Sequence, residues 1–269
     1  MALLGFETGT DKLLVDIDDG VALVTFNNPE KRNALSADIR AALPPTLRAL
    51  QANPQVRVVV LTGAGDKAFV SGADISEFAD QRTTPEARAA YDQAGVDSGR
   101  AWAELDKPVI AMIRGFCIGG GLLTALQADI RIAADNSQFG VPAARLGLGY
   151  GFGGVETLVG LVGPAWAAEI LFSARRLSAD EALHIGLINR VVSADALLHQ
   201  VMGLAHAISD NAPLTVAACK VAIREARRAP ERRNLERVAE MVEACFRSED
   251  YREGQAAFLD KRRPRFSGR

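Results

Sequence analysis

Three short apolar runs restrict the fold of this chain more than any other feature of its sequence. They are Val56–Thr62 (VRVVVLT), Pro108–Ile113 (PVIAMI) and Ile130–Ala134 (IRIAA). A strand that is apolar along nearly its whole length is buried on both faces, as in parallel sheets that are covered by helices. Because strands and helical patterns alternate in this part of the chain, the sequence predicts an α/β core.

Turn and capping residues place the elements before these runs. Asp18-Asp19-Gly20 separates two apolar segments, Leu13–Asp18 and Val21–Phe26, and predicts a hairpin. Ser36 is a suitable N-cap for the helix that follows. Pro44-Pro45 lies in the middle of that helix and should bend or break it, because proline cannot donate the helical hydrogen bond.

Helical patterns also occur between the apolar runs, and they dominate the chain from Pro164 onward. A charged surface helix is expected over Thr83–Leu105, preceded by a mobile loop at Asp80–Thr84. From Pro164 onward, helices are expected at about residues 164–173, 178–185, 194–209, 213–228 and 232–246. We therefore divide the chain into an α/β core, 1–200, and a helical region, 201–269, that packs against the core or another subunit.

Composition excludes several classes of protein. The 269 residues carry 31 Lys+Arg and 33 Asp+Glu, so a nucleic-acid binder with a basic face is not expected. Acidic residues near the amino end and the lack of an apolar run of about 18 residues predict neither a targeting peptide nor a membrane span. The three cysteines are widely spaced and read as reduced thiols of a cytoplasmic protein, without a metal site.

Glycine placement suggests where chemistry occurs. The 24 glycines concentrate in Ser71–Ile75 (SGADI), Gly115–Gly121 (GFCIGGG) and Gly147–Gly154 (GLGYGFGG). The first two clusters follow buried strands, where open α/β sheets place their ligands. The second cluster also opens a helix, whose first amides have no helical partner. Two amides from separate loops that point at one oxygen form an oxyanion hole; tight turns and close packing are the alternative explanation.

The third cluster imitates a dinucleotide-binding fingerprint. Gly149, Gly151 and Gly154 have the required spacing, but Pro142–Leu148 is no apolar strand and Gly163-Pro164 shortens the following helix. We therefore do not expect nicotinamide or flavin binding. Cys117 lacks a histidine nearby in the sequence and is interpreted as a packed thiol rather than a nucleophile.

Several ordered segments resemble the enoyl-CoA hydratase/isomerase family, also called the crotonase family. They are Asn28–Leu35, Phe69–Phe78 (FVSGADISEF), Lys107–Gly121, Ala128–Ile130, Phe139–Pro142, Ala182–Asn189 (ALHIGLIN), Ser248–Arg263 and Phe266–Gly268. The resemblance covers nearly the whole chain. It implies a spiral of ββα turns and a carboxyl-terminal helical region that forms trimers or dimers of trimers.

The resemblance also implies a substrate, a coenzyme A thioester, and no tightly bound cofactor. The thioester oxygen would be held by the amides of Ala73 and Gly120. Residues expected along the coenzyme A path are Ala34, Leu35, Ser71, Asp74 and Ile75, with Phe258 and Lys261 contributed by the tail, which can belong to a neighbouring subunit. For Asp74 the alternative is that its carboxylate only ties the loop, and for the basic tail that it is a solvated end.

Departures from the family pattern bear on the reaction. Hydratases of the family have one glutamate after the triple glycine and another after the Phe-Gly-x-Pro segment, and here these positions are Leu123 and Ala143. Hydration needs positioned acid and base groups, each of which contributes about 10²–10⁴-fold. The aspartate of dienoyl-CoA isomerases corresponds to Gly151. These positions therefore do not favour ordinary hydratase chemistry.

Tyr150 resembles a tyrosine of the methylmalonyl-CoA decarboxylases of the family, although these enzymes have histidine at the position of Ala73. Decarboxylation needs an oriented carboxylate, an apolar pocket and an oxyanion hole, but no carboxylate base. We therefore slightly favour decarboxylase-like lyase chemistry with Tyr150 in the site. The alternatives are a hydratase or isomerase that uses another acid, such as Glu156 or Glu77, and a non-catalytic acyl-CoA-binding protein. A pocket-wall role for Tyr150 and a helix-dipole role for Glu156 also stay open.

Overall fold

A six-stranded sheet forms the centre of the fold in the computed structural model, which describes residues 6–77 and 84–269. Its order is β1 (Leu13–Asp18), β2 (Val21–Phe26), β3 (Val58–Gly63), β5 (Val109–Ile113), β7 (Ile130–Ala134) and β10 (Arg190–Val192). The expected hairpin is present, with Leu13 opposite Phe26, and all other neighbours in this sheet are parallel. The three apolar runs are adjacent strands, as the predicted parallel sheet requires.

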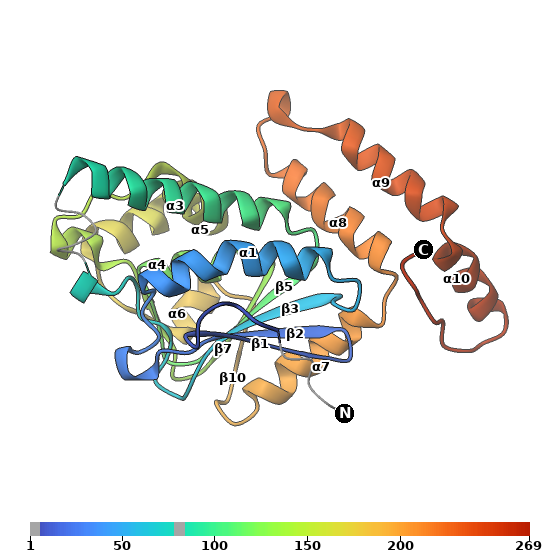
Figure 1. Ribbon diagram of the computed structural model, residues 1–269, viewed down its shortest axis with the longest axis horizontal. Coiled ribbons are helices and arrows are strands. Elements are labelled where there is room, and N and C mark those ends of the chain that lie inside the picture. Colours follow the sequence, from blue (N-terminus) through green and yellow to red (C-terminus); the bar gives the residue numbers. More distant parts are fainter. Residues whose placement is uncertain (1–5, 78–83) are drawn as a thin grey trace.

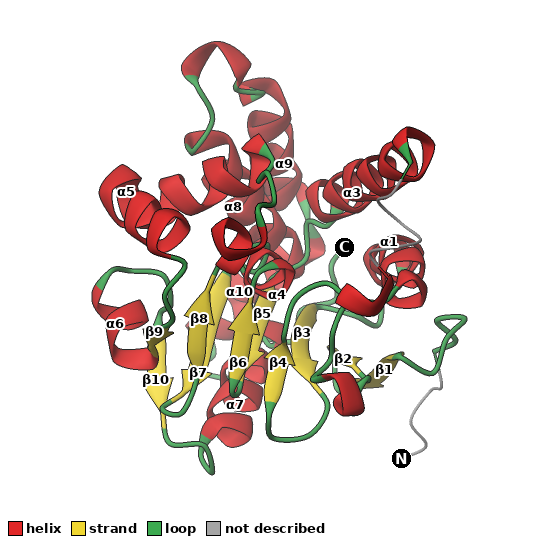
Figure 2. Ribbon diagram, turned by 90° about the vertical axis from the view of Figure 1, so that its left-hand side faces the viewer, coloured by secondary structure: helices red, strands yellow, loops and turns green. Residues whose placement is uncertain are grey.

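A second, four-stranded sheet consists of short strands that the sequence analysis did not predict. Its order is β4 (Ala68–Val70), β6 (Phe116–Ile118), β8 (Gln138–Gly140) and β9 (Leu177–Ser178). In each of the pairs β3–β4, β5–β6 and β7–β8, the first strand belongs to the six-stranded sheet and the second to the four-stranded sheet (Figure 2). The chain then enters a helix. This repetition is the expected spiral of ββα turns.

Helices surround the two sheets and extend away from them at the carboxyl end (Figure 1). They are α1 (Ala37–Ala52), α3 (Pro85–Glu104), α4 (Gly120–Ala125), α5 (Phe152–Ser173), α6 (Ala179–His184), α7 (Leu197–Ser209), α8 (Pro213–Ala226), α9 (Leu235–Arg247) and α10 (Glu249–Leu259). The loop expected at Asp80–Thr84 falls, except for its last residue, outside the described residues.

Helix α1 corrects one expectation. Ser36 caps it as predicted, but the helix continues through Pro44 and Pro45 without a break. The apolar face of the helix is buried, with Ile39, Leu47 and Leu50 all fully inaccessible. Burial of these side chains contributes roughly 1.5–3 kcal/mol each, which offsets the helical hydrogen bonds that the two prolines remove.

The division expected at residue 200 falls inside α7. Leu197, Val201 and Ala205 of this helix pack against the six-stranded sheet, in a cluster that includes Val58 and Ile110. Helix α7 is therefore part of the core layer, and the helices that stand clear of the sheets begin with α8 (Figure 1). Helix α10 was not among the expected helices.

Helix α5 alone, among the described residues, has the length and mean hydropathy of a membrane span. Its helical conformation is interrupted at Gly163, where φ is 75°, immediately before Pro164. The predicted helix 164–173 is thus its second half. Leu158, Val162, Ala167 and Ile170 bury one side of α5 in the core.

Candidate active site

The loop after β4 is held in place by the segment before α1. Ala73 forms a parallel bridge with Leu35. The Leu35 amide donates to the carbonyl of Gly72 at 2.8 Å, and the Asp74 amide donates to the carbonyl of Leu35 at 3.2 Å. These bonds leave the amide of Ala73 without an acceptor among the described residues, so this donor is available to a ligand.

A second available donor lies at the start of α4. Gly119 precedes this helix with φ 55° and ψ −119°, a conformation that favours glycine. The next residue, Gly120, is the first of the helix, so its amide has no intrahelical acceptor. Gly121 is required by packing, because a Cβ atom there would lie 2.0 Å from the carbonyl oxygen of Val70.

The structure brings these two donors together. A Cβ atom built on Gly120 would stand 3.7 Å from the amide nitrogen of Ala73 and 3.9 Å from the carbonyl carbon of Gly72. Two neighbouring amides, neither of which has an acceptor within the described chain, are the arrangement that an oxyanion hole requires. The predicted pairing of Ala73 with Gly120 is therefore geometrically possible.

The residues expected on the coenzyme A path lie around the Ala73 loop. Ala34 is buried and Leu35 reaches Gly120, because its Cδ1 atom would be 3.4 Å from a Cβ atom there. Ser71 donates through its hydroxyl to the carbonyl of Lys31. Ile75 has 61% of its surface exposed, which leaves it accessible to a ligand.

Asp74 has hydrogen-bonding partners inside the protein. Its carboxylate accepts from Lys31 Nζ at 2.7 Å and from the hydroxyl of Ser76 at 2.6 Å. Burial by itself would raise the pKa of Asp74, but the hydrogen bonds from Lys31 and Ser76 outweigh burial, and the pKa lies below its ordinary value. The geometry accords with the loop-tying alternative for this carboxylate.

Phe258 and Lys261 are not brought to this site by their own chain. Phe258 lies in α10 with 85% of its surface exposed, and Lys261 follows this helix. Helix α10 is at the opposite end of the molecule from α4 (Figure 1). A role for these two residues at the thioester site would therefore require a second copy of the chain.

Apolar side chains occupy the two positions at which hydratases of the family carry glutamates. Leu123, Ala143 and Tyr150 are half-buried and pack on the main hydrophobic core. Leu123 and Tyr150 meet at Gly154, where a Cβ atom would be 3.0 Å from Leu123 Cδ2 and 3.3 Å from Tyr150 Cε1. Leu123 and Tyr150 thus form an apolar wall, and Ala143 adds an apolar side chain to the same core cluster.

The hydroxyl of Tyr150 is buried and has no hydrogen-bond partner among the described residues. Burial, together with the nearby Tyr91, raises the pKa of this phenol well above its ordinary range. The group is therefore a neutral hydroxyl at pH 7 and can donate a hydrogen bond. Leaving a buried donor unpaired costs about 1–3 kcal/mol, so the hydroxyl is a candidate for contact with a ligand.

The other candidate acids and the buried thiol contribute little to this picture. Glu77 accepts a hydrogen bond from the Ala37 amide at the start of α1, and Glu156 is exposed on α5. Cys117 is fully buried, and burial raises the pKa of its thiol. It is a packed side chain and not a nucleophile, as expected.

Sequence reasoning missed the side chains that support the Ala73 loop. Asn33 is fully buried with φ 57°, and its side-chain amide donates to the carbonyls of Ala64 and Ala68 at 2.9 and 2.7 Å. The position of this residue in a polar loop is the only sequence signal, and such a signal does not reveal burial. Lys31, the partner of Asp74, lies 43 residues away in the chain.

Comparison with known proteins assigns the chain to a family. The sequence pattern of the enoyl-CoA hydratase/isomerase family matches residues 16–269. The chain belongs to this family. It is 38% identical to the short-chain-enoyl-CoA hydratase of Clostridium acetobutylicum over 253 residues, which cover 94% of this chain and 96% of that protein. It is 37% identical to the crotonyl-CoA hydratase of Syntrophomonas wolfei over 256 residues, or 95% and 98% of the two chains.

Solved structures of the enoyl-CoA hydratase/isomerase family share the fold. An enoyl-CoA hydratase/carnithine racemase from Magnetospirillum magneticum superposes with a TM-score of 0.90 at 35% identity and 97% coverage of both chains. A family member from Hyphomonas neptunium also gives 0.90, at 37% identity and with 98% and 100% coverage. The crotonase fold and an acyl-CoA-processing activity are thereby established for this chain. The relatives named here are hydratases, and none carries the name of a decarboxylase.

Proposed function

We propose that this enzyme stabilises a thioester enolate between the amides of Ala73 and Gly120, and that the enolate arises by decarboxylation of a 2-carboxyacyl-CoA. The observation that carries the proposal is the contact of Leu123 with Tyr150, whose hydroxyl has no partner among the described residues, together with an apolar residue, Ala143, at the second glutamate position. These side chains provide no carboxylate to activate water, but they lower the solvation of a substrate carboxylate.

The reaction needs few groups. Tyr150 donates a hydrogen bond that orients the substrate carboxylate. The bond between the α-carbon and this carboxylate then breaks, carbon dioxide leaves, and the electron pair moves into the enolate. The enolate oxygen receives hydrogen bonds from Ala73 and Gly120, and each such donor typically contributes about 3 kcal/mol to transition-state stabilisation. A proton from water completes the product at the α-carbon.

Hydration or isomerisation of an enoyl-CoA is the second candidate function. The names of the relatives favour it, since both curated proteins described above are hydratases. This reaction would need a carboxylic acid near the thioester, and Glu77 and Glu156 are the candidates that the sequence offers. A non-catalytic acyl-CoA-binding protein is the remaining alternative.

A substrate panel separates these functions. The protein is mixed with methylmalonyl-CoA and with crotonyl-CoA, and product masses are followed. We expect loss of carbon dioxide from the first and no addition of water to the second. Hydration of crotonyl-CoA without decarboxylation would overturn the proposal in favour of the second candidate, and binding of both without turnover would favour the non-catalytic alternative.

Tyr150→Phe tests the assigned role of the hydroxyl. Because this hydroxyl is buried and no described residue bonds to it, its removal should leave the free energy of unfolding unchanged or raise it by about 1 kcal/mol. Decarboxylation should fall at least about tenfold. A variant as active as the parent would show that Tyr150 only forms part of the wall.

Self-association is also part of the proposed function. Ile223, Leu235, Phe246, Phe258 and Leu259 expose large apolar side chains on α8–α10. An exposed apolar surface of this kind is typical of an interface, and we expect a trimer or a dimer of trimers. Phe258 and Lys261 would then reach the coenzyme A site of a neighbouring copy, and a cytoplasmic location remains the prediction from the free thiols.

A further inference from the structure

Leu123 follows the oxyanion-hole candidate directly in α4 and contacts α5. It occupies the first helix turn after Gly120, and its side chain packs on Gly154 next to Tyr150, as the distances of 3.0 and 3.3 Å from a Cβ atom at Gly154 show. This contact joins α4 to α5. Gln127 lies just beyond the end of α4, and Thr157 lies about one helix turn after Gly154 on α5. They are the next residues along the chain on the two sides of this contact.

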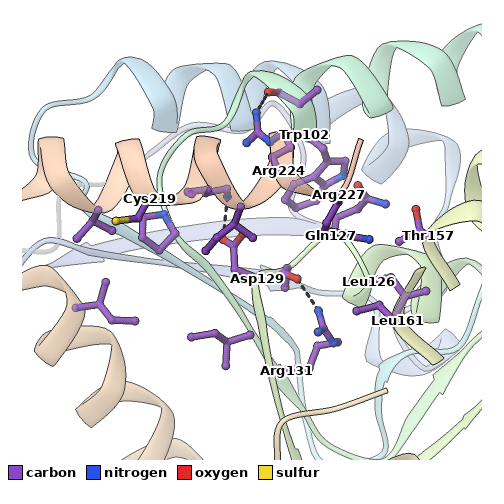
Figure 3. A pocket seen from close by; sticks show the side chains of 18 of the residues that line it. Trp102, Leu126, Gln127, Asp129, Arg131, Thr157, Leu161, Cys219, Arg224 and Arg227 are labelled. Atoms are coloured by element: carbon purple, nitrogen blue, oxygen red, sulfur yellow. Dashed lines mark hydrogen bonds and ion pairs between the residues drawn. The ribbon is translucent and has the colours of Figure 1, made fainter. Parts of the chain in front are cut away.

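Those next residues line a cavity of about 1030 Å³ between the core and α8. Leu126 and Gln127 follow α4, Thr157 and Leu161 belong to α5, and Trp102 closes the α3 side (Figure 3). The lining of this cavity is mixed, because apolar side chains stand beside the charged groups of Asp129, Arg131, Lys220, Arg224 and Arg227. A volume of several hundred Å³ or more is typical of sites for small molecules. Neither Leu123 nor Tyr150 lines this cavity, so the two spaces are distinct.

The expected direction of the acyl chain leads from the thioester-site candidate toward the cavity under α8. Leu35 and the Ala73 loop flank Gly120 on the side where coenzyme A is expected. A thioester whose oxygen lies between the Ala73 and Gly120 amides therefore directs its acyl chain to the opposite side, toward Leu123 and Tyr150. An acyl chain that continued past these residues between α4 and α5 would enter the cavity.

We propose that Leu123 acts as a partition that restricts this enzyme to short acyl chains, and that shortening this side chain joins the thioester site to the cavity under α8. The inference rests on the proposed position of the thioester. A butyryl group ends before the Leu123–Gly154 contact, whereas an octanoyl group must pass it. In the parent protein the Leu123–Gly154 contact closes this path, although a space large enough for the chain, with Leu126 and Leu161 in its lining, lies beyond it.

Binding of saturated acyl-CoAs tests the partition independently of the reaction. Affinities for butyryl-CoA, octanoyl-CoA and dodecanoyl-CoA are measured by titration calorimetry for the parent and for Leu123→Ala. The parent should bind octanoyl-CoA no more tightly than butyryl-CoA. The variant should bind octanoyl-CoA at least about tenfold more tightly than the parent does, since each methylene that becomes buried strengthens binding roughly fourfold.

Two further variants control the measurement. Leu198→Ala removes a leucine side chain that is 54% exposed on α7, far from both spaces, and should bind all three ligands like the parent. Thr157→Leu added to Leu123→Ala narrows the opened path and should reverse the gain. If Leu123→Ala does not fold, Leu123→Val shortens the same side chain and should show a smaller gain in the same direction.

The outcomes distinguish this inference from the proposed function. A parent protein that binds octanoyl-CoA tenfold more tightly than butyryl-CoA, or a Leu123→Ala variant with the parent's chain-length profile, would overturn the partition and leave the proposed reaction intact. Failure of the parent to bind any of the three acyl-CoAs would instead overturn the proposed function, and the partition with it.

Discussion

At the scale of single residues, the absence of a side chain at Gly120 is as important as any group that is present. The Ala73 amide lies close to this residue, since a Cβ atom on Gly120 would meet Leu35 Cδ1 at 3.4 Å and the Ala73 nitrogen at 3.7 Å. Both are ordinary van der Waals distances. Alanine therefore fits the fold at this position but crowds the space beside both donors.

Gly120→Ala should accordingly separate stability from activity. We expect the free energy of unfolding to stay within about 1 kcal/mol of the parent, or to rise, because alanine favours helices over glycine by that amount. Turnover of the substrate identified by the panel should fall about 100-fold, because the added methyl group displaces the thioester oxygen from the amide, which alanine retains, and a misplacement of about 1 Å costs on the order of 100-fold. Urea unfolding and steady-state kinetics measure the two quantities.

Gly203→Ala is the matched control, because Gly203 lies on α7 with no atom within 4 Å of a Cβ position. It should be as stable as the parent, or more stable, and fully active. Equal activity of Gly120→Ala and Gly203→Ala would show that the space beside Gly120 is not used by the thioester oxygen.

At the scale of elements, the Ala73 loop depends on the polar segment before α1. Asn33 links this segment to β4 and to the preceding turn through its bonds to Ala64 and Ala68, and it also accepts from the Asn28 amide at 3.0 Å. No water can replace these bonds easily, since Asn33 is fully buried. The loop that presents the Ala73 amide is thus positioned by residues about 40 positions earlier in the chain.

Asn33→Ala should lower the free energy of unfolding by about 2–4 kcal/mol, because it leaves several buried backbone groups unpaired and places alanine at positive φ. Chemical denaturation measures the change. Asn33→Asp retains the acceptor for Asn28 but loses both donors, and should also be destabilised. A parent-like Asn33→Ala would contradict the structural role assigned to this side chain.

The tail after α10 is held by a carboxylate that titrates in acid. Glu253 accepts from Arg262 at 2.6 and 2.8 Å and from the Arg265 amide at 2.8 Å. The Arg262 hydrogen bonds, and then that of Arg265, lower the pKa of Glu253 to about 2 from its ordinary value of 4.5. The ionised form is therefore the one that stabilises the fold.

Because the pKa is lower in the folded state, the stabilisation by Glu253 is complete above about pH 4.5 and is lost as the pH falls toward 2. Glu253→Gln should therefore be less stable than the parent at pH 6, and the difference should shrink steadily below pH 4.5. Urea unfolding at several pH values measures it. A difference that stays constant over this range would show that the carboxylate charge is not involved.

At the scale of the whole molecule, α8–α10 form a projecting unit that ion pairs connect to the core. Asp106, between α3 and β5, pairs with Arg224 of α8 at 3.3 Å and with Arg237 of α9 at 2.5 Å. Helix α9 nevertheless has no buried residue. An amphipathic helix that is fixed in position but uncovered in one chain is best explained by contact with another copy.

Val242→Glu should therefore disrupt assembly. Val242 and Phe246 are one helix turn apart on α9 and are 43% and 57% exposed, so a charge there would be buried without a partner in an oligomer. Sedimentation velocity should show a trimer or hexamer for the parent and smaller species for the variant. Glu240→Gln, on the polar side of α9, is the control and should assemble normally; a monomeric parent would contradict the proposal.

Much of this architecture could be predicted from the sequence, because it depends on local patterns. The apolar runs gave the strands of the main sheet, Ser36 marked the start of α1, and glycine clusters indicated the two loops of the candidate oxyanion hole. The four-stranded sheet could not be predicted, since its strands have two or three residues each and carry too little periodicity. Pro44-Pro45 gave a wrong expectation because burial of α1 outweighs the propensity of two residues.

The family resemblance, the fold that it implies and the absence of glutamates at positions 123 and 143 depend on residue identity and order, so they could be read without coordinates. Tertiary structure was needed to show that the Ala73 amide lies beside Gly120, that the Tyr150 hydroxyl has no partner among the described residues, and that Leu123 packs against Gly154. An unpaired donor or a contact between two helices is a relation in space among residues from distant elements. Such relations depend on how the two sheets and α4 and α5 pack, which no single segment encodes.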